Sequence, residues 1–316
     1  MPDSGPPIPP RRPRGTRFLA QAIRSGARRY PTHLKASLRS PLHAVAPARV
    51  LEPTFPDAHP LAASWLGHAS VIVQLAGVRV LVDPVFSHRI GPRIAGRTFG
   101  LHRHDDLAGV RLPPIDLVLI THAHFDHLDR PTLERLADSR TRVVAPLRAA
   151  RLIPRGFGDI IELAPGATLA THGIAARAVS PRHWGSRTPL RRGLGVNAYL
   201  LEPESHSAPG PRVLLAGDTA LTRAFDATQP DLAVFGIGAY EPWAHAHATP
   251  EQVWRMFRRS GGRSLLPVHY GSFPLSDEPP EAPLRRLLQA AGEAVERVAP
   301  LAPGEVWVQG SDAGEQ

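Results

Sequence analysis

The sequence predicts a layered α/β fold, and two observations indicate this class. Apolar runs of strand length alternate with segments of helical character, and no linker long enough to divide the body of the chain is visible. Titratable side chains also follow several of the apolar runs, among them His122, His183, Asp218 and His269. In layered α/β folds the loops at strand ends converge, and the strands hold them rigidly. We therefore expect one body, residues 51–316, with its site at one edge of the sheets.

The expected strands start with a hairpin. The runs SVIVQL (70–75) and VRVLVD (78–83) flank a turn at Ala76–Gly77, an arrangement typical of two paired antiparallel strands. The run IDLVLI (115–120) is apolar except for Asp116, as expected of a buried strand. Later strands are expected over residues 142–146, 173–180, 195–202, 212–219, 231–238, 264–271 and 305–309.

Three helices are expected among these strands. Pro131 follows Asp129 by two positions, so we expect Asp129 to cap a helix that starts at TLERLAD (132–138). The segment TPEQVWRMFRRSGG (249–262) has a Thr cap, Pro at its first position and Gly at its end, which are strong helix boundary signals. The amphipathic segment 281–298 predicts a third helix.

The positive charge of the chain is confined to its first fifty residues. The protein has 316 residues, with 37 Lys and Arg against 28 Asp and Glu, and a formal net charge of +9. Residues 1–50 hold nine Arg and one Lys but a single acid, Asp3, so 27 basic and 27 acidic residues remain in 51–316. The basic excess therefore belongs to a Pro/Arg-rich arm and not to the body.

We expect this arm to be partly disordered or packed on the body. Within it, RFLAQAIRSGARR (17–29) places apolar side chains on one helical side and Arg17, Arg24 and Arg28 on the other. Such a segment can contact an anionic membrane peripherally or dock on its own domain. No stretch approaches 18 uninterrupted apolar residues, and the N-terminal segment lacks the apolar core of a secretory signal. The expected location is cytoplasmic, with membrane association through the arm as an extension of it.

The most informative segment is THAHFDHLD, residues 121–129, with three His and two Asp in nine positions. A tight loop after a strand can turn His122 and His124 one way, and the adjacent Asp126 and His127 another. This arrangement predicts two half-sites for metal ions a few ångströms apart.

Each half-site needs further ligands, and a carboxylate shared by both would hold two cations together. His183, Asp218 and His269 each lie near the end of a later expected strand and are placed to complete the sites. Taken singly, Asp218 could cap a helix and His183 could be a core histidine, but their order after the first motif favours ligands.

The expected metal ions are two divalent cations. The chain has no cysteine, which excludes disulfides and thiolate ligands, and nitrogen and carboxylate ligands suit Zn²⁺, with Fe or Mn as alternatives. Two such ions lower the pKa of a bridging water and stabilise charge on the attacking and leaving oxygens. This is hydrolase chemistry, and neither a GxSxG nucleophile motif nor a glycine-rich phosphate loop is present to suggest another route.

These residues resemble those of the metallo-β-lactamase superfamily. The run HAHFDH (122–127), followed by His183, Asp218 and His269, is similar to its metal-binding pattern, and the resemblance extends over roughly residues 60–275. It implies a four-layer αββα sandwich with a dinuclear site at one edge of the two sheets. It also implies one metal ion on His122, His124 and His183, a second on Asp126, His127 and His269, and Asp218 as the bridge.

Other motifs resemble the branch of N-acylphosphatidylethanolamine-hydrolysing phospholipase D enzymes. The opening WLGHAS (65–70), the GDT sequence around Asp218 and the segment IGAYEP (237–242) are similar to this branch. The resemblance implies hydrolysis of a phosphodiester in a zinc-activated site near a membrane surface, with a lipid or another small molecule as substrate. The mechanism we expect is direct attack of a metal-bridging hydroxide on phosphorus or on a carbonyl carbon, with Asp126 orienting the hydroxide and accepting its proton. After Pro242 the sequence WAHAH departs from the lipid enzyme, so the reaction class carries over further than the lipid does.

Several other residues are expected near the metal ligands. His68 and Asp83 are expected to orient ligands through hydrogen bonds, with purely structural roles as the alternative. Trp184 and Trp243 are expected to pack in the core, with lining of the substrate cleft as the alternative. Tyr240 and His247 are further candidates, expected either to orient a metal ligand or to line the substrate cleft.

Three other functions stay open at the level of sequence. A lactonase resembling L-ascorbate-6-phosphate lactonase would use the same metal ions to open a ring ester. A nuclease would suit the basic arm, but nucleic acid is not the expected partner, because phosphate contacts should surround the site and the body is neutral. A metal-binding scaffold without turnover is the alternative outside the enzymes. The sequence does not indicate an oligomeric state.

Overall fold

The computed structural model describes residues 49–56, 59–105, 107–187, 193–204 and 209–310. The helix expected at 17–29 lies outside the described residues, and the division into a basic arm and a body stays a prediction. Among the described residues, no helix has both the length and the apolar character needed to cross a bilayer.

A seven-stranded sheet is built mostly from the first half of the described chain, in the order β12-β11-β10-β4-β3-β2-β19. Its strands are β2 (Leu61–Trp65), β3 (Val71–Leu75), β4 (Val78–Val82), β10 (Leu117–Leu119), β11 (Arg142–Pro146), β12 (Ile160–Leu163) and β19 (Val306–Val308). The expected hairpin is confirmed, since β3 and β4 pair antiparallel with Val71 opposite Val82. Strands β4, β10, β11 and β12 run parallel, so their carboxyl ends share one edge.

A six-stranded sheet follows, in the order β13-β14-β15-β16-β17-β18. Its strands are β13 (Thr168–Thr171), β14 (Ile174–Val179), β15 (Ala198–Pro203), β16 (Val213–Leu215), β17 (Leu232–Gly236) and β18 (Ser264–Val268). Strands β16, β17 and β18 are parallel, and β14 has the same direction because β15 is antiparallel to both β14 and β16. The carboxyl ends of β14, β16 and β18 therefore also lie at one edge.

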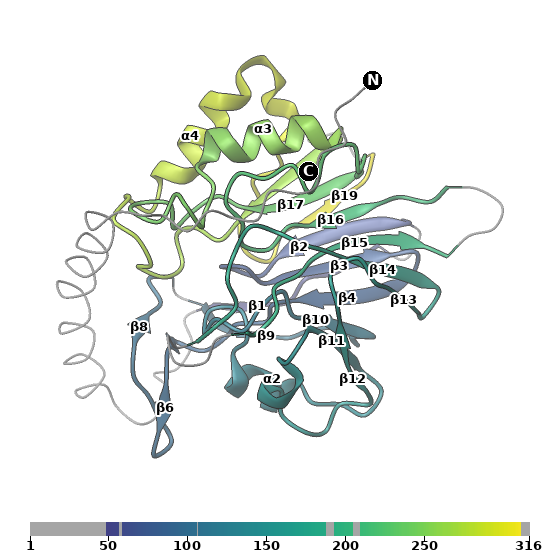
Figure 1. Cartoon of the computed structure of the whole chain (residues 1–316), viewed down its shortest axis with the longest axis vertical. Coiled ribbons are helices and arrows are strands. Elements are labelled where there is room, and N and C mark those ends of the chain that lie inside the picture. Colours follow the sequence, from purple (N-terminus) through teal and green to yellow (C-terminus); the bar gives the residue numbers. More distant parts are fainter. Residues whose placement is uncertain (1–48, 57–58, 106, 188–192, 205–208, 311–316) are drawn as a thin grey trace.

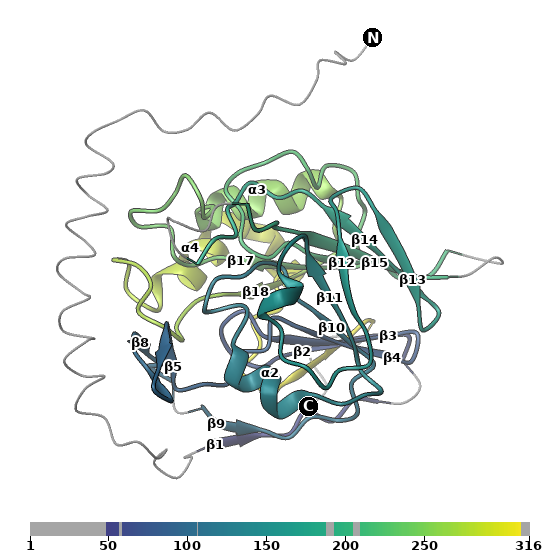
Figure 2. The same cartoon turned by 60° about the horizontal axis from the view of Figure 1, so that its bottom comes forward.

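Helices cover the outer faces of the two sheets, which gives the expected four-layer αββα sandwich (Figures 1 and 2). Helices α3 (Pro250–Ser260) and α4 (Ala282–Ala291) lie over the six-stranded sheet, and α2 (Arg130–Leu136) lies on the seven-stranded side. Apolar side chains of both sheets meet between them, for example those of Val73, Leu119, Leu201 and Val234. Burial of this shared apolar surface is the main force that holds the sheets together.

The helix boundaries agree with the sequence signals at α3 but less well at α4. Thr249 and Gln252 form a reciprocal capping box, and Gly261 ends α3 in the left-handed conformation. The single helix expected over 281–298 is wrong: α4 ends at Ala291, and a 3₁₀ helix continues from Gly292 to Arg297. Gly292 has φ +56°, a conformation that breaks the α-helix although the amphipathic pattern continues.

Asp129 occupies the cap position of α2, but its carboxylate does not bond to a backbone N–H of that helix. It accepts hydrogen bonds from the hydroxyl of Thr132 and from the backbone N–H of Ser87 instead. The expected cap is therefore correct in position and wrong in its bonding, because Asp129 ties α2 to the segment after β4.

Several short strands were not expected from the sequence. They are β2, β12 and β13 in the large sheets, and the pairs β1 (Arg49–Leu51) with β9 (Leu107–Val110), β5 (Arg89–Ile90) with β8 (Leu101–His102) and β6 (Arg93–Ile94) with β7 (Arg97–Thr98). A short 3₁₀ helix, η1 (Ala150–Leu152), is also present. The β5–β8 hairpin projects from the body (Figure 1) and forms one wall of the large cavity described below.

Candidate metal centre

The loop after β10 brings together the four ligands expected from THAHFDHLD. The backbone N–H groups of His127 and Leu128 donate to the carbonyl of His124 at 3.2 and 2.9 Å, which closes a tight turn. The side chains of His122 and His127 are buried completely, and that of Asp126 almost so. The turn directs the four ligand side chains into the space between the two sheet edges.

One group of ligand atoms consists of those expected for the first metal ion and the bridge. The atoms of His122, His124, His183 and Asp218 lie within 4.8 Å of one another. His183 follows β14 and Asp218 follows β16, so both come from the carboxyl edge of the six-stranded sheet. The Nε2 atoms of His122 and His183 each lie 3.7 Å from Oδ2 of Asp218.

A second group consists of the ligands expected for the other metal ion, together with His68. The ligand atoms of His68, Asp126, His127 and His269 also lie within 4.8 Å of one another. Asp218 adjoins this group as well, because its carboxylate oxygens lie 3.1 Å from Nε2 of His127 and 3.3 Å from Nε2 of His269. The Asp218 carboxylate thus adjoins both ligand groups, which is the position expected of a ligand shared by two metal ions. A third, overlapping group adds His247 to Asp218 and His269.

Two imidazole nitrogen atoms of the second group have no hydrogen-bond partner among the described residues, which suits them to bind a metal ion. The Nε2 atoms of His127 and His269 are buried and make no hydrogen bond of acceptable geometry, although carboxylate oxygens lie 3.1–3.3 Å away. Buried polar atoms without partners are destabilising unless something else binds them. Lone pairs that converge on a common centre, beside two carboxylates and without sulfur, are the ligand environment of a divalent cation such as Zn²⁺.

Asp83 fixes an imidazole in each of the two groups. Its Oδ2 lies 2.7 Å from Nδ1 of His127 and 2.5 Å from the hydroxyl of Thr121. The Thr121 hydroxyl donates to Asp83, so it accepts from Nδ1 of His122, which lies 3.0 Å away. Both imidazoles therefore carry their proton on Nδ1 and direct Nε2 toward the candidate metal positions, as expected of residues that orient ligands.

His183 is oriented in the same manner by a backbone carbonyl. Its Nδ1 lies 3.0 Å from the carbonyl oxygen of Ala246, which requires the proton on Nδ1 and leaves Nε2 as the ligand atom. The loop before Asp218 is held equally closely: Gly217 has φ +57°, and a Cβ there would lie 3.0 Å from the side chain of Thr121. Only glycine allows the two loops to approach this far.

Within the second group, His68 and His269 both have strained backbone conformations. Both have positive φ, +50° and +62°, and the N–H of His269 donates to the carbonyl of His68 at 2.8 Å. The backbone N–H of His68 donates to Ser272, and its Nε2 lies 3.1 Å from Oδ2 of Asp126. Left-handed non-glycine residues cost of order 1–3 kcal/mol each and concentrate at functional sites. His68 was expected to orient a ligand through a hydrogen bond, and the structure shows Asp126 as the partner available to it.

Burial and mutual charge set the protonation of the cluster. Burial, with repulsion from neighbouring imidazoles, holds the pKa of His122 well below its ordinary value, so this ligand is neutral. Burial also acts to raise the pKa of Asp126 and Asp218, but the attraction of His127 together with the neighbouring imidazoles outweighs it and keeps both well below the usual range. Burial acts to lower the pKa of His127, and the three carboxylates around it raise this pKa well above its ordinary value. A metal ion bound here would displace that proton.

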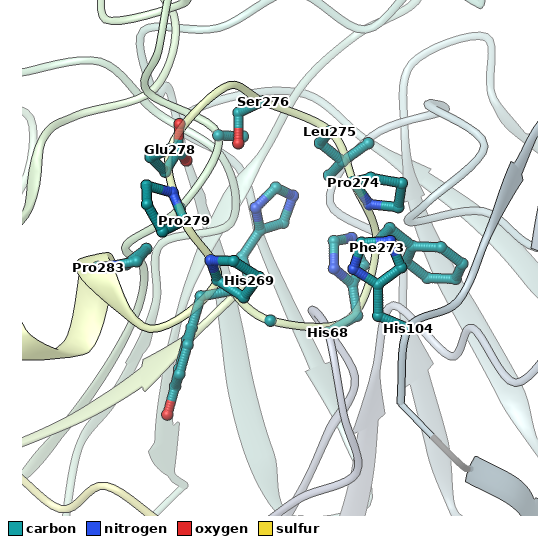
Figure 3. A pocket seen from close by; sticks show the side chains of 15 residues that line it. His68, His104, His269, Phe273, Pro274, Leu275, Ser276, Glu278, Pro279 and Pro283 are labelled. Carbon is teal, nitrogen blue, oxygen red and sulfur yellow. The ribbon is translucent and has the colours of Figure 1, made fainter. Parts of the chain in front are cut away.

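Two cavities of at least 100 Å³ among the described residues reach the cluster. The larger has a volume of about 970 Å³ and is bounded by ligand residues, by the β5–β8 hairpin, and by Phe125, Trp184 and Trp243. The smaller, about 100 Å³, lies beneath the loop that follows His269 (Figure 3). His68, His104 and His269 line this smaller cavity. Its size suits ordered water, whereas the larger one suits an organic substrate.

The residues expected around the ligands divide between the cavity and the core. Trp184 is 45% exposed and stacks on His183 at 4.6 Å between ring centroids, so its expected core packing is wrong, and its side chain lines the large cavity instead. Trp243 and His247 also line the large cavity. Tyr240 is buried and lines neither cavity, and Arg286 covers its ring instead.

Three contributors to the site were not singled out in the sequence. Thr121 connects Asp83 to His122, Ser272 holds the backbone of His68, and Arg187 binds the ligand loop from the cavity side. Thr121 opens the motif and Arg187 lies four residues after His183, so proximity to ligands was the one available signal. Ser272 offered none beyond its place three residues after His269.

The fold and the site together define the class of the protein. An αββα sandwich whose two sheets present buried His and Asp ligands at a common edge is a metal-dependent hydrolase. Residues 78–270 match the family described as the beta-lactamase superfamily domain, and the chain belongs to this superfamily.

Individual relatives agree with this assignment. The chain is 33% identical over 269 residues to an uncharacterised protein of Mycobacterium tuberculosis, covering 79% of this chain and 69% of the relative. It is 25% identical over 324 residues to N-acyl-phosphatidylethanolamine-hydrolyzing phospholipase D 1 of Caenorhabditis elegans, covering 86% of each chain. Among solved structures, a metallo hydrolase of Ignicoccus hospitalis matches with a TM-score of 0.56 and 20% identity, over 78% of this chain and 97% of the other.

Proposed function

We propose that the protein is a phosphodiesterase that uses two divalent metal ions, with Zn²⁺ as the preferred ion and Fe or Mn as alternatives. The observation that carries this proposal is the position of Asp218, whose carboxylate adjoins both ligand groups. Two cations side by side would activate a water molecule and stabilise charge on the attacking and leaving oxygens of a phosphoryl group.

The ligand assignment within this proposal follows the two groups. His122, His124 and His183 would hold one ion, and Asp126, His127 and His269 the other, with Asp218 shared. His68 would stay outside the second ion as a hydrogen-bond donor, since its Nε2 lies 3.1 Å from Oδ2 of Asp126.

Asp126 lies where its carboxylate could accept the proton of the attacking water. Its carboxylate borders the large cavity. Burial acts to raise its pKa, but attraction by His127 and contacts with His269 and His68 together hold this pKa well below the usual range, so the carboxylate is ionised and able to accept. The water oxygen would bond to phosphorus while the bond from phosphorus to the leaving alcohol oxygen breaks. The hydrogen bond from His68 would keep the Asp126 carboxylate in position during this exchange.

Two further features support a phosphodiester with an apolar substituent. The relative from Caenorhabditis elegans that aligns over 86% of both chains carries the name of a phospholipase D. The large cavity has apolar walls, with Ile90, Phe99 and Leu101 on one side and Pro274 and Leu275 on another. Contact of the arm, residues 1–50, with an anionic membrane and a cytoplasmic location stay predictions.

The proposal is tested by metal analysis and a substrate panel on the wild-type protein and on Asp218→Ala. The panel contains a phosphodiester, a phospholipid, a neutral lactone and an amide. We expect about two metal ions per wild-type chain, preferred turnover of a phosphodiester, and loss of both metal and turnover in the variant. Full metal content and activity in Asp218→Ala would sink the dinuclear site. Preference for the lactone would indicate a lactonase, and two bound metal ions without any turnover would indicate a scaffold.

A further inference from the structure

Arg187 is the one arginine or lysine among the described residues that line the large cavity. The other lining residues are apolar, aromatic or small, apart from candidate ligands and two serines. Its positive charge therefore lies in the same space as Asp126 and Asp218, on the side from which a substrate would approach. A half-buried cation in such a place needs a physical explanation.

The contacts of Arg187 hold its guanidinium firmly but do not neutralise it. Its Nε donates to the carbonyl of Ala123 at 2.6 Å, and one Nη2 hydrogen goes to the carbonyl of Leu128. The guanidinium lies over the ring of Phe125, 4.5 Å from its centroid. Uncharged carbonyls and an aromatic face are its neighbours, and within the described part of the chain no carboxylate forms an ion pair with it at 4.0 Å or less.

The charge of Arg187 persists at neutral pH. Burial lowers the pKa of Arg187 to about 10, against an opposing influence of Asp129 and Asp126 and with repulsion from Arg130. A guanidinium has five N–H donors, and the two carbonyl contacts account for two of them. As far as contacts with the described residues go, donors and charge thus remain for a ligand in the cavity.

We propose that Arg187 is the specificity-determining residue that binds an oxyanion of the substrate, which in the proposed function is the non-bridging oxygens of a phosphodiester. This inference deepens the proposed function and rests on it. A guanidinium presents a planar fork that matches two oxygens of a phosphate, and charge-assisted hydrogen bonds of this kind are stronger than neutral ones. Since Ala123 and Leu128 flank the ligand loop, the same contacts fix the anion subsite relative to the metal ligands.

A purely structural role for Arg187 makes a different prediction. If the residue only clamped the loop of residues 123–128, its replacement would reduce metal content and would slow neutral and anionic substrates to the same extent. Selection of an oxyanion instead changes KM for anionic substrates alone. The two roles are therefore separable by substrate charge.

The test compares zinc-loaded full-length wild-type protein with Arg187→Gln, using bis(4-nitrophenyl) phosphate as the anionic substrate and 4-nitrophenyl acetate as the neutral one. We expect KM for the phosphodiester to rise about tenfold or more in Arg187→Gln, the value of one charge-assisted hydrogen bond, and KM for the acetate to change less than about twofold. Arg187→Lys, which keeps the charge without the fork, should fall between the two. Equal effects on both substrates, or loss of zinc from both variants, would overturn the proposal.

Arg130→Gln is the matched control. Arg130 lies on α2 outside the cavity, pairs with Glu134 at 3.0 Å and has a side chain that is 57% exposed. Its replacement removes one nearby positive charge without touching the cavity wall, so the ratio of the two KM values should stay at the wild-type level. A change as large as that in Arg187→Gln would show a long-range field and contradict a specific subsite.

Binding of inorganic phosphate to the zinc-loaded protein, measured by calorimetry, gives a readout that needs no turnover. We expect Arg187→Gln to weaken phosphate binding about tenfold. That result without any phosphodiester hydrolysis would uphold the oxyanion subsite while refuting the proposed reaction. Phosphodiester hydrolysis by the wild-type protein, with phosphate affinity unchanged in Arg187→Gln, would uphold the proposed reaction and refute the oxyanion subsite.

Discussion

Asp83 and His127 form a buried pair in which Nδ1 of the imidazole donates to Oδ2 of the carboxylate at 2.7 Å. The N–H and hydroxyl of Thr121 donate to the same carboxylate at 2.7 and 2.5 Å, and the hydroxyl in turn accepts from His122. One carboxylate at the end of β4 thus orients an imidazole in each ligand group. Its removal should affect both metal positions, although Asp83 belongs to neither group of candidate ligands.

We expect Asp83→Asn to weaken metal binding about 10- to 100-fold, the usual effect of losing a residue that orients a metal ligand. Oδ2 of Asp83 accepts from His127 and from the Thr121 hydroxyl, while Oδ1 accepts from the Thr121 N–H. An asparagine side chain has one carbonyl oxygen, so its NH2 group would face one of these donors. Competition with a chelator of known zinc affinity measures the change.

Asp116→Asn is the control for this measurement. Asp116 precedes β10, which pairs in parallel with β4, so it lies at the opposite edge of the sheet from Asp83, and it accepts the backbone N–H of Arg79 at 2.8 Å. The substitution removes one carboxylate charge far from the ligand edge, so zinc affinity should match the wild type. Equal zinc affinity in Asp83→Asn and wild type would show that the buried pair is structural only.

His247 should make the metal-free protein sensitive to acid. Burial is the main cause that lowers the pKa of His247 from 6.5 to about 4, despite the opposing charge of Asp218. The unfolded imidazole takes up a proton first as the pH falls, so the stabilisation is fully present above pH 6.5 and is lost between pH 6.5 and about 4. In His247→Gln, measured in excess chelator, the urea midpoint should fall less steeply over this range than in the wild type.

The exposed histidine His172, on the turn between β13 and β14, provides the comparison. His172→Gln removes an exposed histidine and leaves His247 in place, so its urea midpoint should depend on pH in the same way as that of the wild type. Parallel curves for His247→Gln and wild type would mean that His247 does not contribute to acid sensitivity.

The capping box of α3 should contribute about 1 kcal/mol to stability. Thr249 accepts from the N–H of Gln252, whose side chain accepts from the N–H of Thr249 at 3.1 Å. Thr249→Ala breaks this reciprocal pair, and the expected loss of unfolding free energy is typical of a cap substitution. Urea unfolding measures it, and zinc content should stay constant because α3 lies on the outer face of the sheet. A loss below about 0.3 kcal/mol would show that water replaces the cap without cost.

The sequence was most informative where local rules apply. His122, His124, Asp126 and His127 could be found because one tight loop holds all four. His183, Asp218 and His269 could be found because each lies near the end of an expected strand, and parallel strands bring their carboxyl ends to one edge. The two-residue turn of the β3–β4 hairpin and the boundaries of α3 likewise depend on residues that are adjacent in sequence.

What the sequence did not reveal depends on contacts between distant segments. Strand β2 (LAASW) is buried at all five positions, so it has no polar alternation to identify it. Trp184 looks like a core residue by composition, and only the loop that carries it places it on the cavity wall. Arg187 touches carbonyls some sixty residues away in the chain, and apart from its place four residues after His183 no local pattern distinguishes it from the other arginines.

Tyr199→Phe tests the connection between the two sheets directly beneath the ligand loop. Tyr199 lies on β15 in the six-stranded sheet, and its buried hydroxyl donates to the carbonyl of Ile120, just after β10, at 2.9 Å. Phenylalanine fills the same space but leaves this carbonyl without the donor, which costs about 1–3 kcal/mol for a buried group. The unfolding free energy from urea titration of the zinc-loaded protein should fall by this amount, with the dependence on urea concentration unchanged. Since the ligands keep their own hydrogen bonds, zinc content should remain at the wild-type level. A variant as stable as the wild type would show that this hydrogen bond does not contribute to joining the sheets at the site.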